Sequence, residues 1–143
     1  MALNSPANAK IFTLNLPPRR LETKYPIGTS PLDLNLPFAV TSGVKFRDVP
    51  ESVKITQLFG DSAAFDFSPY HKRMDLILVD ASHLYDYVKN DTEQAFKMIK
   101  RSGVILWHDY PRGRDVARCL DDLASHMPIH HLAGTSLALY RSA

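Results

Sequence analysis

The fold is decided by residues 74–109, which read MDLILVDASHLYDYVKNDTEQAFKMIKRSGVILWHD. The first six of them, residues 74–79, are almost uniformly apolar, as expected of a strand that is covered on both faces. Apolar residues then recur at helical spacing through residues 84–100, and Gly103 ends this helical stretch. Residues 104–107 form a second run of the buried-strand type. A strand, a helix and a strand in this order predict two parallel strands joined by a helical crossover.

The sequence that follows predicts one more helix and a closing pair of strands. Residues 115–127 carry their apolar side chains on one helical face, among them Cys119, which we expect to be a small buried hydrophobe. Residues 129–132 and 136–140 are short strand candidates on either side of Gly134. The unit therefore ends in a terminal strand pair.

Two further strands are predicted upstream, at residues 10–16 and 53–59. Seven of the ten prolines lie in residues 1–50, and proline both fixes φ and removes a hydrogen-bond donor, so residues 17–50 predict a long irregular segment. We expect a single α/β domain over residues 1–143, with a mainly parallel sheet, helical crossovers and the terminal strand pair.

The composition excludes several classes of protein. The 143 residues are 45% hydrophobic and 22% charged, which is typical of a globular domain. The net charge of +2 is not gathered into a basic run, so a nucleic-acid partner is not expected. The lone Cys119 cannot form an intrachain disulfide, and no apolar run approaches the ~20 residues of a membrane span. The first residues do not have the pattern of a signal peptide, so we expect a cytoplasmic protein without a membrane partner.

Polar side chains follow four of the predicted strands. Ligands of parallel α/β sheets bind beyond the carboxyl ends of the strands, so these side chains are candidate site residues. Carboxylates next to imidazoles favour a divalent metal site, or a general base beside a metal. The alternative is that these residues only cap turns and helix starts, as Asp, Ser and Asn often do. The candidates are Asn15, Asp61, Ser62, Asp80, His83, His108 and Asp109.

These residues carry a resemblance to a known family. Residues 79–91, VDASHLYDYVKND, resemble the fourth-strand motif of class I S-adenosylmethionine-dependent methyltransferases. Residues 102–109, SGVILWHD, complete the pattern of one branch, D-G-x-H-x-Y followed by a helix and G-G-x-x-x-x-H-D. Residues 11–16, 60–62 and 134–140 resemble the second strand, the end of the third strand and the final strand of the family.

The resemblance implies a Rossmann-like fold with S-adenosylmethionine as the cofactor. In the metal-dependent O-methyltransferases that it points to, acidic residues after the fourth and fifth strands hold a divalent cation such as Mg²⁺. The cation orients the hydroxyl group of a small-molecule acceptor and lowers its pKa. Carried over to this chain, the cofactor residues are Asn15, Asp61, Ser62 and Asp80, the metal ligands are Asp80, His108 and Asp109, and the catalytic base is His83.

The chain departs from the family pattern at its N-terminal end. The family's first strand leads into a glycine-rich turn that lets the backbone approach the cofactor, and here no two of the six glycines lie within three residues of each other. We therefore expect a truncated domain without the first strand and helix, in which the second and fourth strands leave a gap or pair directly. Position 15 is Asn where the family has an acid, and position 81 is Ala where it has Gly. A homodimer could cover the exposed sheet.

Three functions remain open on this reasoning. The first is an O-methyltransferase that works once a partner or an unusual fold completes the cofactor site. The second is a non-catalytic remnant that acts as an interaction domain. The third is a domain that binds a metal or a small ligand through the Asp and His residues at the strand ends.

Overall fold

The computed structural model describes residues 1–16, 43–112 and 114–143. These residues form two compact units, Met1–Phe65 and Asp66–Ala143, and each unit is described by itself. A single domain over residues 1–143 stays a prediction. Most of the proline-rich segment predicted to be irregular lies outside the described residues.

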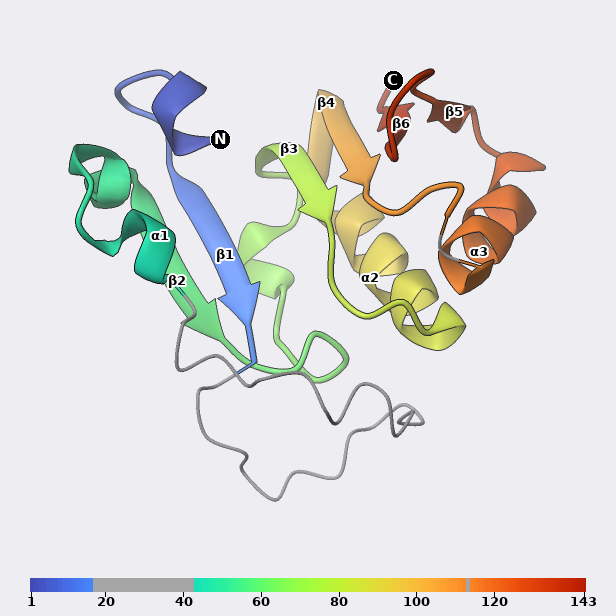
Figure 1. The fold of residues 1–143 in the computed structure, drawn as a ribbon, viewed down its shortest axis with the longest axis horizontal. Helices are drawn as coiled ribbons and strands as arrows, with labels where there is room; N and C mark the ends of the chain where they lie inside the picture. Colours follow the sequence, from blue (N-terminus) through green and yellow to red (C-terminus); the bar gives the residue numbers. More distant parts are fainter. Residues whose placement is uncertain (17–42, 113) are drawn as a thin grey trace. The chain divides into compact units, whose positions relative to one another are not determined.

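The first unit contains a pair of parallel strands (Figure 1). Strands β1 (Ile11–Asn15) and β2 (Ile55–Phe59) pair from Ile11 opposite Ile55 to Asn15 opposite Phe59. The predicted 53–59 strand begins two residues late, because a 3-10 helix with proline in its first turn, η3 (Pro50–Lys54), occupies the preceding residues. The end of the segment predicted to be irregular also holds a single helical turn, α1 (Val44–Arg47).

Within the first unit, Lys54 contacts the N-terminal residues. They form a short 3-10 helix, η1 (Ala2–Asn4), before β1 begins. The Lys54 ammonium group donates to the carbonyl oxygens of Ala2 at 3.2 Å and Ser5 at 3.1 Å. Lys54, the last residue of η3, therefore links this helix to the N-terminal 3-10 helix η1.

The second unit is built from alternating strands and helices. After the short 3-10 helix η4 (Ser68–Tyr70), the order is β3 (Met74–Val79), α2 (Tyr85–Met98), β4 (Ile99–Trp107), α3 (Arg114–Ala124), β5 (His130–His131) and β6 (Ala138–Arg141). The strands lie in the order β3-β4-β6-β5, with β3 and β4 parallel and the other neighbours antiparallel. The predicted helical crossover and terminal strand pair are confirmed, and the chain has the α/β fold of a Rossmann-like domain.

The described strands form two sheets, where the sequence analysis expected one mainly parallel sheet. Strands β1 and β2 make a two-stranded sheet, and the other four strands make the second sheet. Direct pairing of the 10–16 and 74–79 strands was one of the two expected arrangements, and β1 and β3 instead belong to different sheets.

The start of β4 differs from the prediction. The helix ends at Met98 and the strand begins with the next residue, so Gly103 lies inside β4 and does not end the helix. The register against β3 shifts here, from Met74 opposite Ile99 to Leu76 opposite Val104. A Cβ atom on Gly103 would lie 2.7 Å from Ile99 Cδ1 and 3.0 Å from the carbonyl oxygen of Lys100, so a larger residue here would force its neighbours to move.

The core lies between the four-stranded sheet and helices α2 and α3, which Figure 1 shows side by side. Alternate residues of β4 point into it, and Ile105 and Trp107 are almost completely buried. Cys119 is buried on α3 as predicted, and its burial raises the pKa of the thiol to about 11. In the described residues, no helix is long and apolar enough to cross a membrane.

One buried polar contact ties α2 to the end of β4. Trp107 is 1% exposed, and its indole N–H donates to the hydroxyl oxygen of Thr92 at 2.9 Å. Thr92 is also 1% exposed, so neither group can exchange its partner for water. The contact satisfies the polar atom of the largest side chain in the core.

Replacing Thr92 by Val tests this contact. Valine keeps the shape of threonine but leaves the buried indole N–H without an acceptor, so the free energy of unfolding falls by about 1–3 kcal/mol. Urea denaturation followed by circular dichroism measures the change. The matched control is Thr56→Val on the exposed side of β2, which changes stability by less than about 0.5 kcal/mol. Equal effects at the two positions would contradict a special role for the buried hydroxyl.

Candidate functional site

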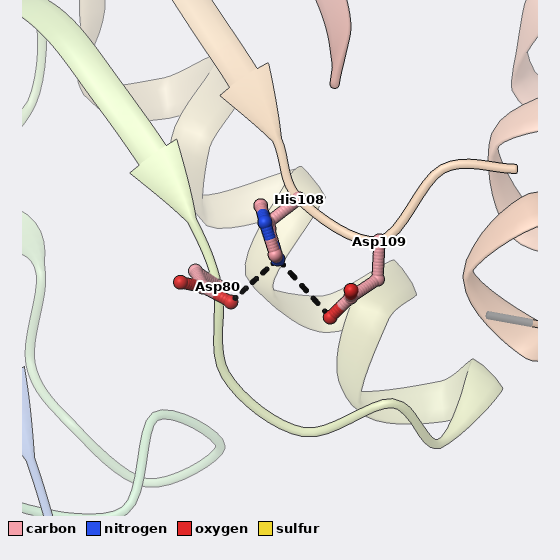
Figure 2. A group of neighbouring side chains, drawn as sticks. All are labelled: Asp80, His108 and Asp109. Carbon is pink, nitrogen blue, oxygen red and sulfur yellow. Dashed lines mark ion pairs between the residues drawn. The ribbon is translucent and has the colours of Figure 1, made fainter. Parts of the chain in front are cut away.

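The candidate site lies at the carboxyl ends of the parallel strands β3 and β4 (Figure 2). Val79 and Trp107, the last residues of the two strands, are paired in the ladder. The His108 N–H continues the ladder by donating to the carbonyl oxygen of Val79 at 3.1 Å. The residues that follow, Asp80 on one strand and His108 on the other, are therefore brought side by side by the parallel register.

The imidazole of His108 faces two carboxylates. Its Nδ1 atom lies 3.4 Å from Asp80 Oδ1 and 3.2 Å from Asp109 Oδ2, as the dashed lines in Figure 2 show. The Nδ1 atom is buried, yet within the described part of the chain no hydrogen bond reaches it with acceptable geometry. One donor atom from each of the three residues lies within 4.8 Å of the other two. Two carboxylate oxygens around a buried nitrogen without a hydrogen bond are a donor set that fits a divalent cation.

The other nitrogen of His108 contacts a residue that the sequence analysis did not identify. His108 Nε2 lies 3.1 Å from the hydroxyl oxygen of Ser136. The carbonyl oxygen of Ser136 also accepts the N–H of Tyr110 at 3.0 Å. In the sequence, Ser136 is only the first residue of the predicted strand 136–140. That position gives no indication of a functional role.

His83 joins the same group of side chains through Asp109. Its Nε2 atom lies 2.7 Å from Asp109 Oδ2, the oxygen that also faces His108. The His83 side chain is 59% exposed, so an incoming molecule can reach it. A carboxylate that orients an accessible imidazole is an arrangement suited to general base catalysis.

The alternative role as a turn cap holds for one of the candidates, Asp61. The turn before α2 is capped by Ser82, whose hydroxyl oxygen accepts the Leu84 N–H at 3.3 Å. Asp61 likewise accepts the Ala63 N–H at 2.9 Å and so closes its own turn. The carboxylates of Asp80 and Asp109 instead lie next to imidazole rings.

The four predicted residues of the second unit line one pocket. Its walls are the strand-end residues Asp80, His83, His108 and Asp109, and its apolar lining includes Val88, Trp107 and Val116. The pocket therefore joins polar strand-end side chains to an apolar lining.

The remaining cofactor candidates lie in the first unit. Asn15 is the last residue of β1, and its carbonyl oxygen accepts the N–H of Gly60 at 2.9 Å. Asp61 and Ser62 follow Gly60 directly, so the three side-chain candidates share the carboxyl end of the two-stranded sheet. Their expected role toward a cofactor stays a prediction.

Comparison with protein-family models identifies a family. A family model described as a methyltransferase domain matches residues 25–110, which is more than half of the chain. The match extends through β2, β3, α2 and β4 and ends one residue after Asp109. No curated protein matches the sequence.

Asp109 itself has an unusual backbone. Its φ of 62° lies in the left-handed region, where a side chain other than glycine costs about 1–2 kcal/mol and where Asp and Asn are the best tolerated. The conformation directs the carboxylate back toward both histidines. A residue with the wrong backbone preference would therefore disturb the site even if its side chain were small.

Substitutions at Asp109 separate the backbone effect from the chemistry. Asp109→Ala lowers the free energy of unfolding by about 1–2 kcal/mol more than Asp109→Asn, because only Asn tolerates the left-handed conformation. Urea denaturation in the presence of a chelator measures both variants. The same two substitutions at Asp75, in the extended strand β3, serve as the control and differ little. If Ala and Asn were equivalent at position 109, the left-handed conformation would not contribute.

Proposed function

The chain belongs to the methyltransferase domain family, and on that premise we propose that it transfers the methyl group of S-adenosylmethionine to a hydroxyl group of a small molecule, with the help of a divalent cation. The observation that carries the proposal is the group of side chains at the ends of β3 and β4. It combines a metal-type donor set with an accessible histidine held by a carboxylate.

The metal ligands in this proposal are Asp80, His108 and Asp109. What supports them is the buried Nδ1 atom of His108, which faces both carboxylates without a hydrogen bond to either. When bound, the cation polarises the acceptor hydroxyl and lowers its pKa. The carboxylates of Asp80 and Asp109 supply the negative charge that offsets the charge of the cation.

His83 is the proposed catalytic base. Its Nε2–H donates to Asp109 Oδ2, which leaves the Nδ1 lone pair to accept the proton of the acceptor hydroxyl. The hydroxyl oxygen forms a bond to the methyl carbon while the carbon–sulfur bond breaks, and its electron pair stays on sulfur. Asp109 then stabilises the imidazolium form of His83 by its negative charge.

For the cofactor, we propose Asn15, Asp61, Ser62 and Asp80 as binding residues. What supports them is their position after strands, because parallel α/β sheets bind their ligands beyond the carboxyl ends of the strands. Asn15 offers one neutral oxygen where a carboxylate would accept two ribose hydroxyls, so this contact is weaker.

The second candidate function is a non-catalytic domain that binds a metal or a small ligand. The observation that favours it is the spacing of the six glycines, none of which forms a glycine-rich turn for close approach of the backbone to a cofactor. The two candidates share the metal site and differ in whether S-adenosylmethionine binds.

Calorimetry with the purified chain distinguishes these candidates. We expect S-adenosylmethionine to bind with a micromolar dissociation constant, and Mn²⁺ to bind in a separate titration. The double variant Asp80→Asn, Asp109→Asn loses the Mn²⁺ signal, because two of three ligands lose their charge. Asn keeps the backbone preference at position 109, so the loss is not one of folding.

Two outcomes would decide against parts of the proposal. Binding of Mn²⁺ without binding of S-adenosylmethionine at millimolar concentration would favour the non-catalytic domain. Undiminished Mn²⁺ binding by the double variant would show that these side chains do not form the metal site.

We also propose that the chain forms a homodimer through β3. What supports this is the exposure of two leucines on one face of the strand, Leu76 at 45% and Leu78 at 41%. In the described part of the chain, β3 is also one of the two outer strands of its sheet. Exposed apolar side chains on an outer strand favour association with a second strand.

Sedimentation equilibrium tests the homodimer. The parent chain sediments as a dimer at micromolar concentration, and Leu76→Thr, Leu78→Thr shifts it toward monomer while keeping residues that favour strands. The matched control is the same double substitution at Leu3 and Leu16, which lie in the other unit, and it leaves the dimer intact. A parent chain that is monomeric throughout would exclude this proposal.

A further inference from the structure

Ser136 lies beside both neighbours of Asp109. Its hydroxyl oxygen is 3.1 Å from His108 Nε2, and its carbonyl oxygen accepts the N–H of Tyr110 at 3.0 Å. The residue precedes β6, which runs antiparallel to β4 and begins at Ala138, opposite Trp107. The antiparallel pairing of β6 with β4 therefore places Ser136 next to His108 and Tyr110, the residues on either side of Asp109.

The contact with His108 bears on which ring nitrogen holds the proton. A neutral imidazole has one N–H group, and the partner of one nitrogen determines the state of the other. If Nε2–H donates to Ser136, Nδ1 keeps its lone pair and presents it to Asp80 and Asp109. An N–H at Nδ1 would instead be expected to form a hydrogen bond with a carboxylate at 3.2 or 3.4 Å, and neither contact has that geometry.

A nitrogen ligand also affects which cation is preferred. Carboxylates alone suit Mg²⁺, Ca²⁺ and Mn²⁺, whereas imidazole nitrogen suits first-row transition ions such as Fe²⁺, Co²⁺, Ni²⁺ and Zn²⁺. An imidazole that binds metal through one nitrogen generally donates its other N–H to a fixed acceptor. The Ser136 hydroxyl oxygen, 3.1 Å from His108 Nε2, is in position to be that acceptor.

We propose that Ser136 is a positioning residue that holds His108 with Nδ1 as a metal ligand, so that the site takes a divalent first-row transition ion in preference to Mg²⁺. This inference rests on the proposed metal site and adds the class of cation and the residue that selects it. Ser136 acts through His108 and contacts neither acceptor nor cofactor in this account.

Metal titration of the full chain tests the inference, with Co²⁺ and Mg²⁺ as probes. Calorimetry gives both affinities, and the visible absorption of bound Co²⁺ reports on its ligands. The parent chain binds Co²⁺ more tightly than Mg²⁺. Ser136→Ala weakens Co²⁺ binding by about 10–100-fold and leaves Mg²⁺ binding almost unchanged, whereas Ser136→Thr keeps the hydroxyl and restores the Co²⁺ affinity.

The matched control is Ser125→Ala, which removes a hydroxyl that donates to the carbonyl oxygen of Asp122 just after α3. Its Co²⁺ affinity and absorption spectrum equal those of the parent chain. Equal Co²⁺ affinity in Ser136→Ala and the parent would overturn the role of Ser136. Equal affinity of the parent for Mg²⁺ and Co²⁺ would overturn the preference for a transition ion.

A second measurement does not need the metal. Nitrogen-15 NMR of the histidine rings at about pH 9, where histidine side chains are ordinarily neutral, reports which nitrogen of His108 carries hydrogen, with His108→Gln used to assign the signal. The parent chain shows the hydrogen on Nε2, and Ser136→Ala shows a mixture. A hydrogen on Nδ1 in the parent would overturn the inference. Hydrogen on Nε2 together with no Co²⁺ binding would overturn the metal site on which the proposed function rests.

Discussion

The hydrogen bond between Trp107 and Thr92 is the contact on which the arrangement of the site depends. Both side chains are 1% exposed, so the indole N–H has no alternative partner in water. Trp107 ends β4 and is followed at once by His108 and Asp109. Fixing the indole against α2 therefore fixes the point from which two of the site residues leave the strand. The parallel pairing of Val79 with Trp107 then sets Asp80 at the same level.

Asp109 is the side chain that joins the two histidines. One of its oxygens lies 2.7 Å from His83 Nε2 and 3.2 Å from His108 Nδ1. In the proposed function the two rings carry hydrogen on the same atom, Nε2, and differ in what faces Nδ1. The Nδ1 atom of His83 is available to an incoming hydroxyl, and that of His108 faces the two carboxylates. In the proposals made above, the same residue type is thus a base at an exposed position and a ligand at a position whose nitrogen is buried.

The match between sequence and structure follows the strength of the hydrophobic pattern. Residues 74–79 form β3 with the predicted bounds, because a continuous apolar run favours a strand. In the described residues β3 is not covered on both faces as expected, since Leu76 and Leu78 are exposed. The start of β4 was predicted wrongly because Gly103 was read as a helix end. Its actual role depends on its distance from Ile99, which no local pattern contains. The predicted strand at residues 53–59 begins later, at Ile55, because a 3-10 helix runs through Lys54.

The sequence by itself determined the class of fold and four of the residues that meet at the site. Asp80, His83, His108 and Asp109 follow two consecutive parallel strands, and parallel strands end on the same side of a sheet, so local patterns suffice to bring them together. Only the tertiary structure decided the contact of Ser136 with His108 and the sharing of Asp109 by two histidines. Ser136 reaches His108 across 28 residues of sequence, through the antiparallel return of β6 onto β4. The orientation of Asp109 depends in turn on a left-handed backbone at a single residue. Contacts of this kind are set by register and backbone geometry, which the hydrophobic pattern of a chain does not encode.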